Sequence, residues 1–208
     1  MAVPYIATWS AEQTLPARVV HHSLIGIAYA GEMPGDRDEN GILWRRVTSH
    51  QGQGQPLFGK VHSARQRRAM LEMRCQVCGE PADRTDEGTL WILQDRRADW
   101  PRWPENLQAV EPPICLPCAR LSRKLCPALR KGAVTVRVGH APVSGVYGVR
   151  YQQGDPFPEA VEDTIVSFTA ADARWIVAGQ LVRQLFKCAV VDLDAITNTP
   201  AVHLPLPE

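Results

Sequence analysis

Cys75-Gln-Val-Cys78 and Cys115-Leu-Pro-Cys118 are two Cys-x-x-Cys pairs separated by 36 residues. Two residues between paired cysteines let both thiolates face one metal ion, and four thiolates complete the tetrahedral shell of a structural zinc site. We therefore predict that Cys75, Cys78, Cys115 and Cys118 bind one structural Zn²⁺. A closed four-sulfur shell keeps no open position for substrate or water, so this zinc predicts a role in folding rather than in catalysis.

Two other uses of paired cysteines are a redox dithiol and a disulfide framework. A thioredoxin-like dithiol has a single Cys-x-x-Cys, whereas here the motif is doubled. Disulfides need an oxidising compartment, and Met1–Tyr5 contains no basic segment followed by an apolar run that would direct export. We therefore expect a cytoplasmic protein. Cys126 and Cys188 fit small buried residues better than additional metal ligands.

Composition and charge indicate a globular protein with an uneven charge distribution. The chain has 208 residues, of which 45% are hydrophobic, and this is enough to bury a core. No apolar run approaches the roughly 20 residues that a helix needs to span a bilayer. Although the net charge is +1, Lys60–Arg74 and Arg120–Lys131 are basic and residues 151–208 are acidic. Positive charge therefore flanks the cysteine segment.

Residues 1–59 are predicted to form an N-terminal β-hairpin region. Leu24–Tyr29 and Ile42–Val47 favour strands, and the stretch Gly31–Gly41 between them is typical of a long turn. An extended segment or a short helix is expected around Ser10–Leu15. The Gln- and Gly-rich stretch Ser49–Gly59 predicts a flexible connector to the next region.

Residues 60–131 are predicted to form a zinc module. Ser63 is expected to cap a helix over Ala64–Met73, with its arginines facing outward. Thr89–Leu93 favours a strand, and Cys115–Leu125 favours a helix whose first turn carries the second cysteine pair. A cysteine loop, a hairpin and a helix in this order form a treble clef, and the helix amides would offset the thiolate charge.

Residues 132–208 are predicted to form C-terminal β-strands and a helix. Ala133–Val138 and Gly145–Tyr151 are expected to pair, with Thr164–Phe168 as a third strand. Ala170–Lys187 has apolar residues at helical spacing and predicts a helix, followed by a strand over Cys188–Leu193 and an irregular tail after Thr199. The predicted fold class is thus α+β, with a zinc-stabilised treble-clef core, flanking antiparallel β-strands and a C-terminal helix.

Residues of about 65–125 resemble the HNH endonuclease family, a treble-clef fold in which the same cysteine pairs hold zinc. The resemblance is carried by Cys75–Gly79, by Glu105-Asn-Leu107 and by the second cysteine pair. In that family the strand between the pairs ends in Asp-His, whose histidine is the general base, but here the matching place reads Asp95-Arg96. Ala119 stands where Asn or His is typical. The resemblance therefore implies the fold and argues against nuclease activity. The layout of the whole chain is also similar to that of bacterial proteins labelled phage-like.

Basic residues on both sides of the cysteines are candidates for phosphate contacts, although a solvated charged face is the simpler alternative. They are Arg65, Arg67, Arg68, Arg120, Arg123 and Lys124. We expect a zinc-binding, non-catalytic binding or regulatory protein that contacts DNA or RNA through them and a protein partner through the helix at Ala170–Lys187. One alternative is an enzyme acting on a small molecule at the junction of the zinc module and its flanks. Its candidate residues are His21, His22, His50, His62 and His140. A divergent HNH nuclease is a less favoured alternative.

Overall fold

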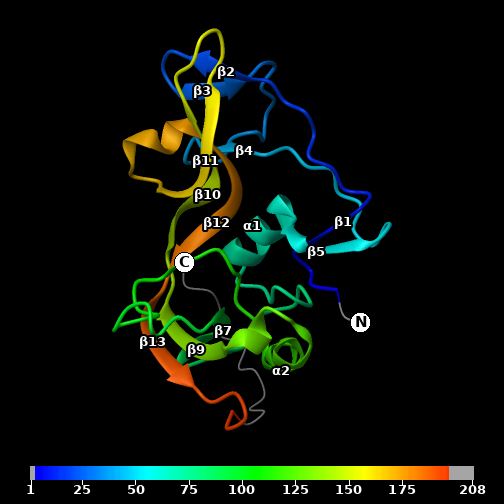
Figure 1. Ribbon diagram of the computed structural model, residues 1–208, viewed down its shortest axis with the longest axis vertical. Helices are drawn as coiled ribbons and strands as arrows, with labels where there is room; N and C mark the ends of the chain where they lie inside the picture. Colours follow the sequence, from blue (N-terminus) through cyan, green and yellow to red (C-terminus); the bar gives the residue numbers. More distant parts are fainter. Residues whose placement is uncertain (1–2, 197–208) are drawn as a thin grey trace. The chain divides into compact units, whose positions relative to one another are not determined.

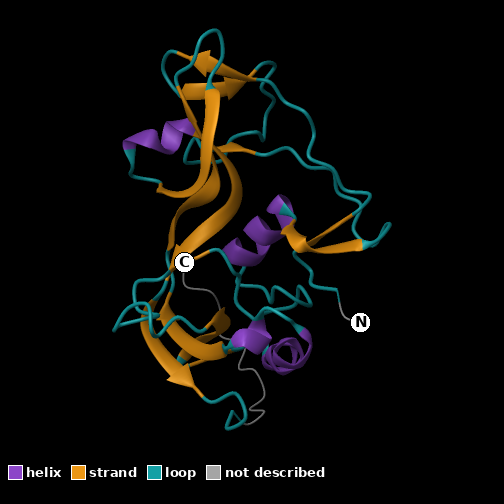
Figure 2. Ribbon diagram, viewed as in Figure 1, coloured by secondary structure: helices purple, strands orange, loops and turns teal. Residues whose placement is uncertain are grey.

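A computed structural model describes residues 3–196 of the chain (Figure 1). Figure 2 shows that strands predominate, and the described residues include two α-helices, α1 (Ser63–Leu71) and α2 (Leu116–Leu125). The mixed α+β class predicted from the sequence is therefore confirmed. The tail expected to be irregular after Thr199 lies outside the described residues. Within residues 3–196, neither helix has the length and apolar character that crossing a membrane requires.

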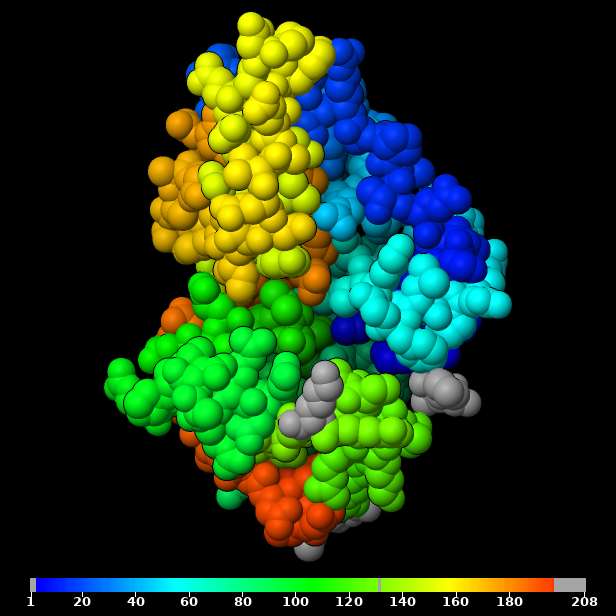
Figure 3. Space-filling view, in the orientation of Figure 1, coloured from blue at the N-terminus to red at the C-terminus, as the bar shows by residue number. Residues whose placement is uncertain are grey.

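The chain divides into two compact units, each assembled from segments that are distant in the sequence. Unit 1 combines the start of the chain through Tyr5, the segment Arg68–Pro142 and the chain from Arg183 onward, whereas unit 2 combines Ile6–Arg67 and Val143–Val182. The region boundary expected near residue 59 falls inside unit 2, and that near residue 131 falls inside unit 1. In Figure 3, yellow and blue surfaces from the two segments of unit 2 adjoin each other.

Unit 1 is built on an antiparallel sheet with the strand order β13-β9-β7-β6. The strands are β6 (Arg84–Thr85), β7 (Gly88–Gln94), β9 (Ala133–His140) and β13 (Phe186–Val191). Side chains alternate along β7: Trp91 and Leu93 pack with Val136 in one apolar cluster, and Leu90 and Ile92 pack with Cys75 in another. Because successive residues of a strand face opposite sides, both faces of this sheet are covered.

Unit 2 contains one larger sheet and two strand pairs. The larger sheet has the order β11-β10-β12-β4, and the pairs are β1 with β5 and β2 with β3. The strands are β1 (Ala7–Trp9), β2 (Val19–His22), β3 (Gly26–Tyr29), β4 (Leu43–Trp44), β5 (Pro56–Val61), β10 (Val143–Gln152), β11 (Glu159–Ser167) and β12 (Ile176–Gln184). Ile27, Tyr29, Leu43 and Val177 form its apolar cluster. The last two residues of β12, Arg183 and Gln184, belong to unit 1 and pair there with the short strand β8 (Gln108–Ala109).

The N-terminal hairpin differs from the prediction. β2 pairs with β3 across the short connection Ser23–Ile25, whereas β4 pairs in parallel with β12. The stretch Gly31–Gly41 does not close a hairpin, because its acidic side chains fold it onto itself. Asp36 accepts the Met33 N–H at 2.6 Å, and Asp38 accepts the Ile42 N–H at 3.0 Å. The helix considered around Ser10–Leu15 is not formed either.

The predicted helix Ala170–Lys187 is wrong. Its residues form a 3₁₀ turn, η2 (Ala171–Trp175), then β12 and the start of β13. Ile176, Val177 and Ala178 are consecutive and all buried, and such runs rich in β-branched residues favour strands that are covered on both faces. In a nearly continuous apolar run, apolar residues also occur three and four positions apart, so the run matches a helical pattern without being a helix. The helix proposed as a surface for a protein partner therefore does not exist.

The strands expected over Ala133–Val138 and Gly145–Tyr151 exist as β9 and β10, but they do not pair with each other. β9 pairs with β7 and β13, whereas β10 lies between β11 and β12. Ala141 and Pro142 separate the two strands, and the division into units falls at this point. The strand predicted near Thr164 is confirmed as β11, which pairs with β10.

Candidate metal centre

The first cysteine pair lies in a tight loop that follows α1. The Cys75 N–H donates to the Glu80 carbonyl at 2.7 Å, and the Gly79 N–H donates to the Cys75 carbonyl at 2.9 Å. Gly79 has a φ of 78°, which side chains other than hydrogen rarely permit. The Val77 N–H also points to Cys75 Sγ at 3.4 Å. The loop is therefore closed by its own backbone around Cys75.

The second cysteine pair lies at the start of α2. Cys115 is the N-cap residue with an extended backbone, and Cys118 lies in the first turn. Pro117 fits there because the first-turn N–H groups of a helix have no intrahelical acceptor. The N-terminal end of a helix carries partial positive charge, which stabilises nearby thiolates. The position of the pair in the helix thus agrees with the prediction.

Hydrogen bonds from Gln76 join the first cysteine pair to the segment that precedes the second pair. The Gln76 N–H donates to the Pro113 carbonyl at 3.0 Å, and Gln76 Nε2 donates to the Pro112 carbonyl at 2.9 Å. The Ile114 N–H donates to the Leu90 carbonyl at 2.9 Å, which ties the approach to α2 to strand β7. As a result, the sulfur atoms of the four cysteines all lie within 4.8 Å of one another.

The sulfur geometry fits a shared metal ion. Cys78 Sγ and Cys115 Sγ are 3.7 Å apart. Four sulfurs placed tetrahedrally at about 2.3 Å from zinc would be separated by about 3.8 Å, whereas a disulfide requires about 2.05 Å. All six cysteines are free. The cluster can therefore bind a metal ion such as zinc.

The charge state of the cluster also favours a cation. A hydrogen bond from Cys115 lowers the pKa of Cys75 to about 5, whereas burial raises the pKa of Cys118 to about 12. The hydrogen bond to Cys75 raises the pKa of Cys115. Thiols packed this closely cannot all ionise together, since each new thiolate would meet the charge of its neighbours. A divalent ion would supply the opposing charge and release the remaining protons.

Cys126 and Cys188 do not belong to this cluster. Cys126 is the C-cap residue of α2 and is half-buried. Cys188 lies in β13, where its sulfur is 3.7 Å from the Pro104 carbonyl, and burial raises its pKa to about 12. Both positions agree with the expectation of small packed residues.

The motif Glu105-Asn-Leu107 has a structural use that the sequence did not reveal. The Glu105 carboxylate accepts the N–H groups of Lys187 and Cys188 at 3.1 and 3.0 Å. Asn106 has a φ of 67°, and its N–H donates to the Leu185 carbonyl at 2.8 Å. The motif therefore anchors the beginning of β13.

Where the HNH resemblance implies a catalytic histidine the chain has Arg96, which is exposed and follows Asp95, and where it implies Asn or His the chain has Ala119. Asp95 directly follows β7 and is paired with Arg97 at 2.7 Å, and this hydrogen bonding lowers the pKa of Asp95 to about 2. Ala119 is fully buried in the same apolar cluster as Cys75. Neither position presents a free proton acceptor beside the cysteines.

The three arginines of α1 have different surroundings. Arg65 is buried and donates to the two carboxylate oxygens of Glu12 at 2.6 and 2.7 Å, so the expected outward orientation is wrong. The Arg67 guanidinium lies 4.3 Å from the centre of the Trp44 ring. Arg68 is exposed and pairs with Glu72 at 2.9 Å.

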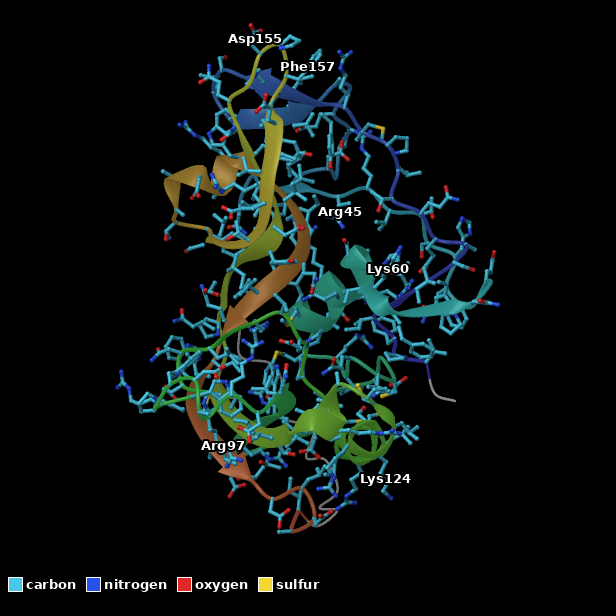
Figure 4. All side chains as sticks on the ribbon, in the orientation of Figure 1. Arg45, Lys60, Arg97, Lys124, Asp155 and Phe157 are labelled. Carbon is cyan, nitrogen blue, oxygen red and sulfur yellow. The ribbon has the colours of Figure 1, made fainter. Side chains whose placement is uncertain are left out.

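The three basic residues of α2 lie in unit 1. Arg120 donates to the Ile196 carbonyl at 2.7 Å, and Arg123 pairs with Asp194 at 2.6 Å. Lys124 is exposed (Figure 4). Asp194 is therefore close to the charges of all three basic residues of α2, which together lower its pKa.

The five candidate histidines are divided between the two units, with His140 in unit 1 and the other four in unit 2. His140 lines a cavity of about 510 Å³ in unit 1, and the buried His62 lines a cavity of about 680 Å³ in unit 2. His21 Nε2 is 2.8 Å from the Gly154 carbonyl, and His22 and His50 are exposed. Each of the two cavities contains one of the five histidines, so neither provides the paired histidines that the small-molecule enzyme requires.

Comparison of the chain with protein-family models, with curated proteins and with solved structures finds no match. The cysteine cluster is therefore interpreted from its own geometry.

Proposed function

We propose that the protein binds one structural Zn²⁺ through Cys75, Cys78, Cys115 and Cys118, and that the surrounding segment of unit 1 is a treble clef. The four converging sulfurs carry this proposal. The order of the cysteine loop, the β6–β7 hairpin and α2 supports it. Because zinc binding requires reduced thiols, we also propose a reducing compartment such as the cytoplasm.

We further propose that the protein is a non-catalytic binding module. Four sulfurs would fill the zinc shell, which leaves no position for an activated water. Arg96 and the buried Ala119 stand where the HNH family carries its catalytic histidine and an Asn or His. Both features support binding rather than phosphodiester hydrolysis.

The surface proposed to contact DNA or RNA is the exposed side of α2. Lys124 is solvated, and the Arg123–Asp194 pair has exposed partners. Such surface pairs contribute about 1 kcal/mol or less, so a phosphate could replace Asp194 as the partner of Arg123. Arg68 is a further candidate because its partner Glu72 is also exposed. Arg65 is excluded because it is buried against Glu12.

A metal count tests the proposed zinc site, and a DNA titration separately tests the proposed nucleic-acid surface. Protein purified without chelator should contain close to one zinc per chain. Binding to a duplex oligonucleotide, followed by fluorescence anisotropy over a series of salt concentrations, should weaken in the Arg123→Gln/Lys124→Gln variant. Each lost phosphate contact reduces the slope of log K against log salt by roughly 0.9. Zinc content should not change.

The matched control is Arg84→Gln/Lys187→Gln, which removes two exposed charges from the same unit but outside α2. If both variants weaken DNA binding equally, the affinity depends on the total charge of the protein and not on the α2 surface. No DNA or RNA affinity at roughly 50 mM salt, where phosphate contacts are strong, would refute nucleic-acid binding. Absence of metal would refute the zinc site, and metal-dependent DNA cleavage that depends on Asp95 would refute the non-catalytic assignment.

A further inference from the structure

The start of α1 differs from the prediction. His62, rather than Ser63, caps the helix: His62 Nδ1 accepts the Arg65 N–H at 3.4 Å, and the His62 carbonyl accepts the Gln66 N–H at 3.0 Å. His62 Nε2 lies 3.0 Å from the Thr48 carbonyl and donates to it. Ser63 is the first helical residue, and it is buried.

Ser63 lines the cavity of about 680 Å³ in unit 2, although the residue is only 4% exposed. Other lining residues come from the β1–β5 pair, from the segment after β4 and from β12. They include Thr8, Thr14, Arg45, Lys60 and Gln180. The volume lies within the range of small-molecule sites, about 300–1,000 Å³.

The acidic residue of the cavity is already neutralised. Glu12 accepts two hydrogen bonds from Arg65, and its carboxylate also accepts the N–H groups of Trp9 and His50. Burial raises the pKa of Glu12, but these hydrogen bonds outweigh it and lower the pKa to about 2. Glu12 therefore stays ionised and paired with Arg65 at neutral pH, and its charge is not available to other cations.

Arg45 and Lys60 supply positive charge that the protein does not compensate. Arg45 follows β4 and is half-buried, with its guanidinium packed close to Gly179, and Lys60 lies on β5 shortly before α1 begins (Figure 4). Neither residue forms an ion pair with a carboxylate in the range 3–196. A half-buried guanidinium without a counter-ion is unfavourable, because it has lost part of its hydration. The cavity thus combines two uncompensated cations with a buried hydroxyl.

We propose that this cavity is a binding site for a small phosphate monoester. Arg45 and Lys60 would pair with the phosphate charge, the Ser63 hydroxyl would donate a hydrogen bond, and the N-terminal end of α1 would add its partial positive charge. A phosphate monoester carries a charge of about −1.5 to −2 at neutral pH, which matches two cations better than a single carboxylate does. The remaining volume accommodates the organic part of the molecule.

Calorimetric titration with ribose 5-phosphate, ribose and inorganic phosphate tests this site. Ribose 5-phosphate should bind, ribose should not bind, and inorganic phosphate should bind more weakly than the ester. Arg45→Gln/Lys60→Gln should reduce the affinity for ribose 5-phosphate at least about tenfold, since both charged hydrogen-bond donors to the phosphate are removed. The control Arg18→Gln/Arg174→Gln removes two exposed charges of unit 2 that do not line the cavity.

Ser63→Ala separates a binding role from a structural one. Because His62 provides the helix cap, this substitution should lower the affinity for ribose 5-phosphate while the melting temperature stays unchanged. The proposal is refuted if ribose 5-phosphate does not bind to folded wild-type protein or binds no better than ribose. Equal losses in the cavity variant and its control would refute it as well. Equal affinity for inorganic phosphate would refute the assignment to an ester.

Discussion

The buried ion pair between Glu12 and Arg65 gives a quantitative prediction for unit 2. Replacing Glu12 by Gln keeps the shape of the side chain but leaves the Arg65 guanidinium buried without its counter-charge. Glu12 and Arg65 have side chains that are 1% and 7% exposed, respectively. Bulk water therefore offsets little of the lost carboxylate charge.

Two routes give a similar magnitude for this loss. The pKa of Glu12 falls from 4.5 to about 2 in the folded protein, which corresponds to roughly 3 kcal/mol of stabilisation. Removal of one partner from a buried ion pair costs about 3–5 kcal/mol in other proteins. We therefore expect Glu12→Gln to lower the free energy of unfolding by about 3 kcal/mol at neutral pH.

The pH dependence follows from the sign of the shift. Because the folded pKa lies below the unfolded value of 4.5, the stabilisation is fully present above that value and is lost as the pH falls toward 2. The difference in unfolding free energy between wild type and Glu12→Gln should therefore be large at neutral pH. Near pH 3 it should shrink to less than about half.

Urea unfolding followed by tryptophan fluorescence measures this difference. The control is Glu162→Gln, which removes the carboxylate of an exposed pair with Arg150 in the same unit and should cost about 1 kcal/mol or less. Equal losses for the two variants, or a difference between wild type and Glu12→Gln that does not change with pH, would refute this account.

Three other predictions concern the metal centre and the larger sheet. Cys78→Ser should abolish zinc binding and leave the protein sensitive to proteases in limited digestion. The reason is that structural zinc supplies on the order of 10 kcal/mol of apparent binding energy. The control variant Cys188→Ser should retain its zinc. A strong chelator should lower the melting temperature of wild-type protein measured by circular dichroism, and an unchanged melting curve after zinc loss would contradict a folding role. Gly148→Ala should destabilise the protein by about 1–3 kcal/mol through overpacking, since its new Cβ would meet the Val177 carbonyl, whereas Gly59→Ala has open space and should be nearly neutral in the same thermal melt.

Local sequence patterns were sufficient for several elements of unit 1. The cysteine cluster is set by two short spacings, so its ligands could be recognised before any long-range contact was known. Strand β7 and helix α2 are likewise defined by short apolar and capping patterns. These features depend on neighbouring residues, which a sequence displays directly.

Features that depend on distant residues could not be predicted. Arg65 was expected to face water, but its burial is compensated by Glu12, which lies 53 positions away in the chain. The apolar run at Ile176–Gln184 matches both a helical face and a strand covered on two sides, and only its neighbours β10 and β4 decide between them. One local feature was also predicted incorrectly: the ring of His62, and not the hydroxyl of its neighbour Ser63, caps α1.

Each unit is assembled from segments that are separated in the sequence, and this sets the order in which the two units can be completed during synthesis. All four cysteines of the metal cluster leave the ribosome before β9, and the edge strand β13 of the same sheet is made more than sixty residues after Cys118. Unit 2 receives its last strand, β12, immediately before that. If the cysteines bind zinc as proposed, a nascent chain can capture the ion while the sheet of unit 1 still lacks its final strand. The metal would then hold the early half of that unit in place until synthesis supplies the rest.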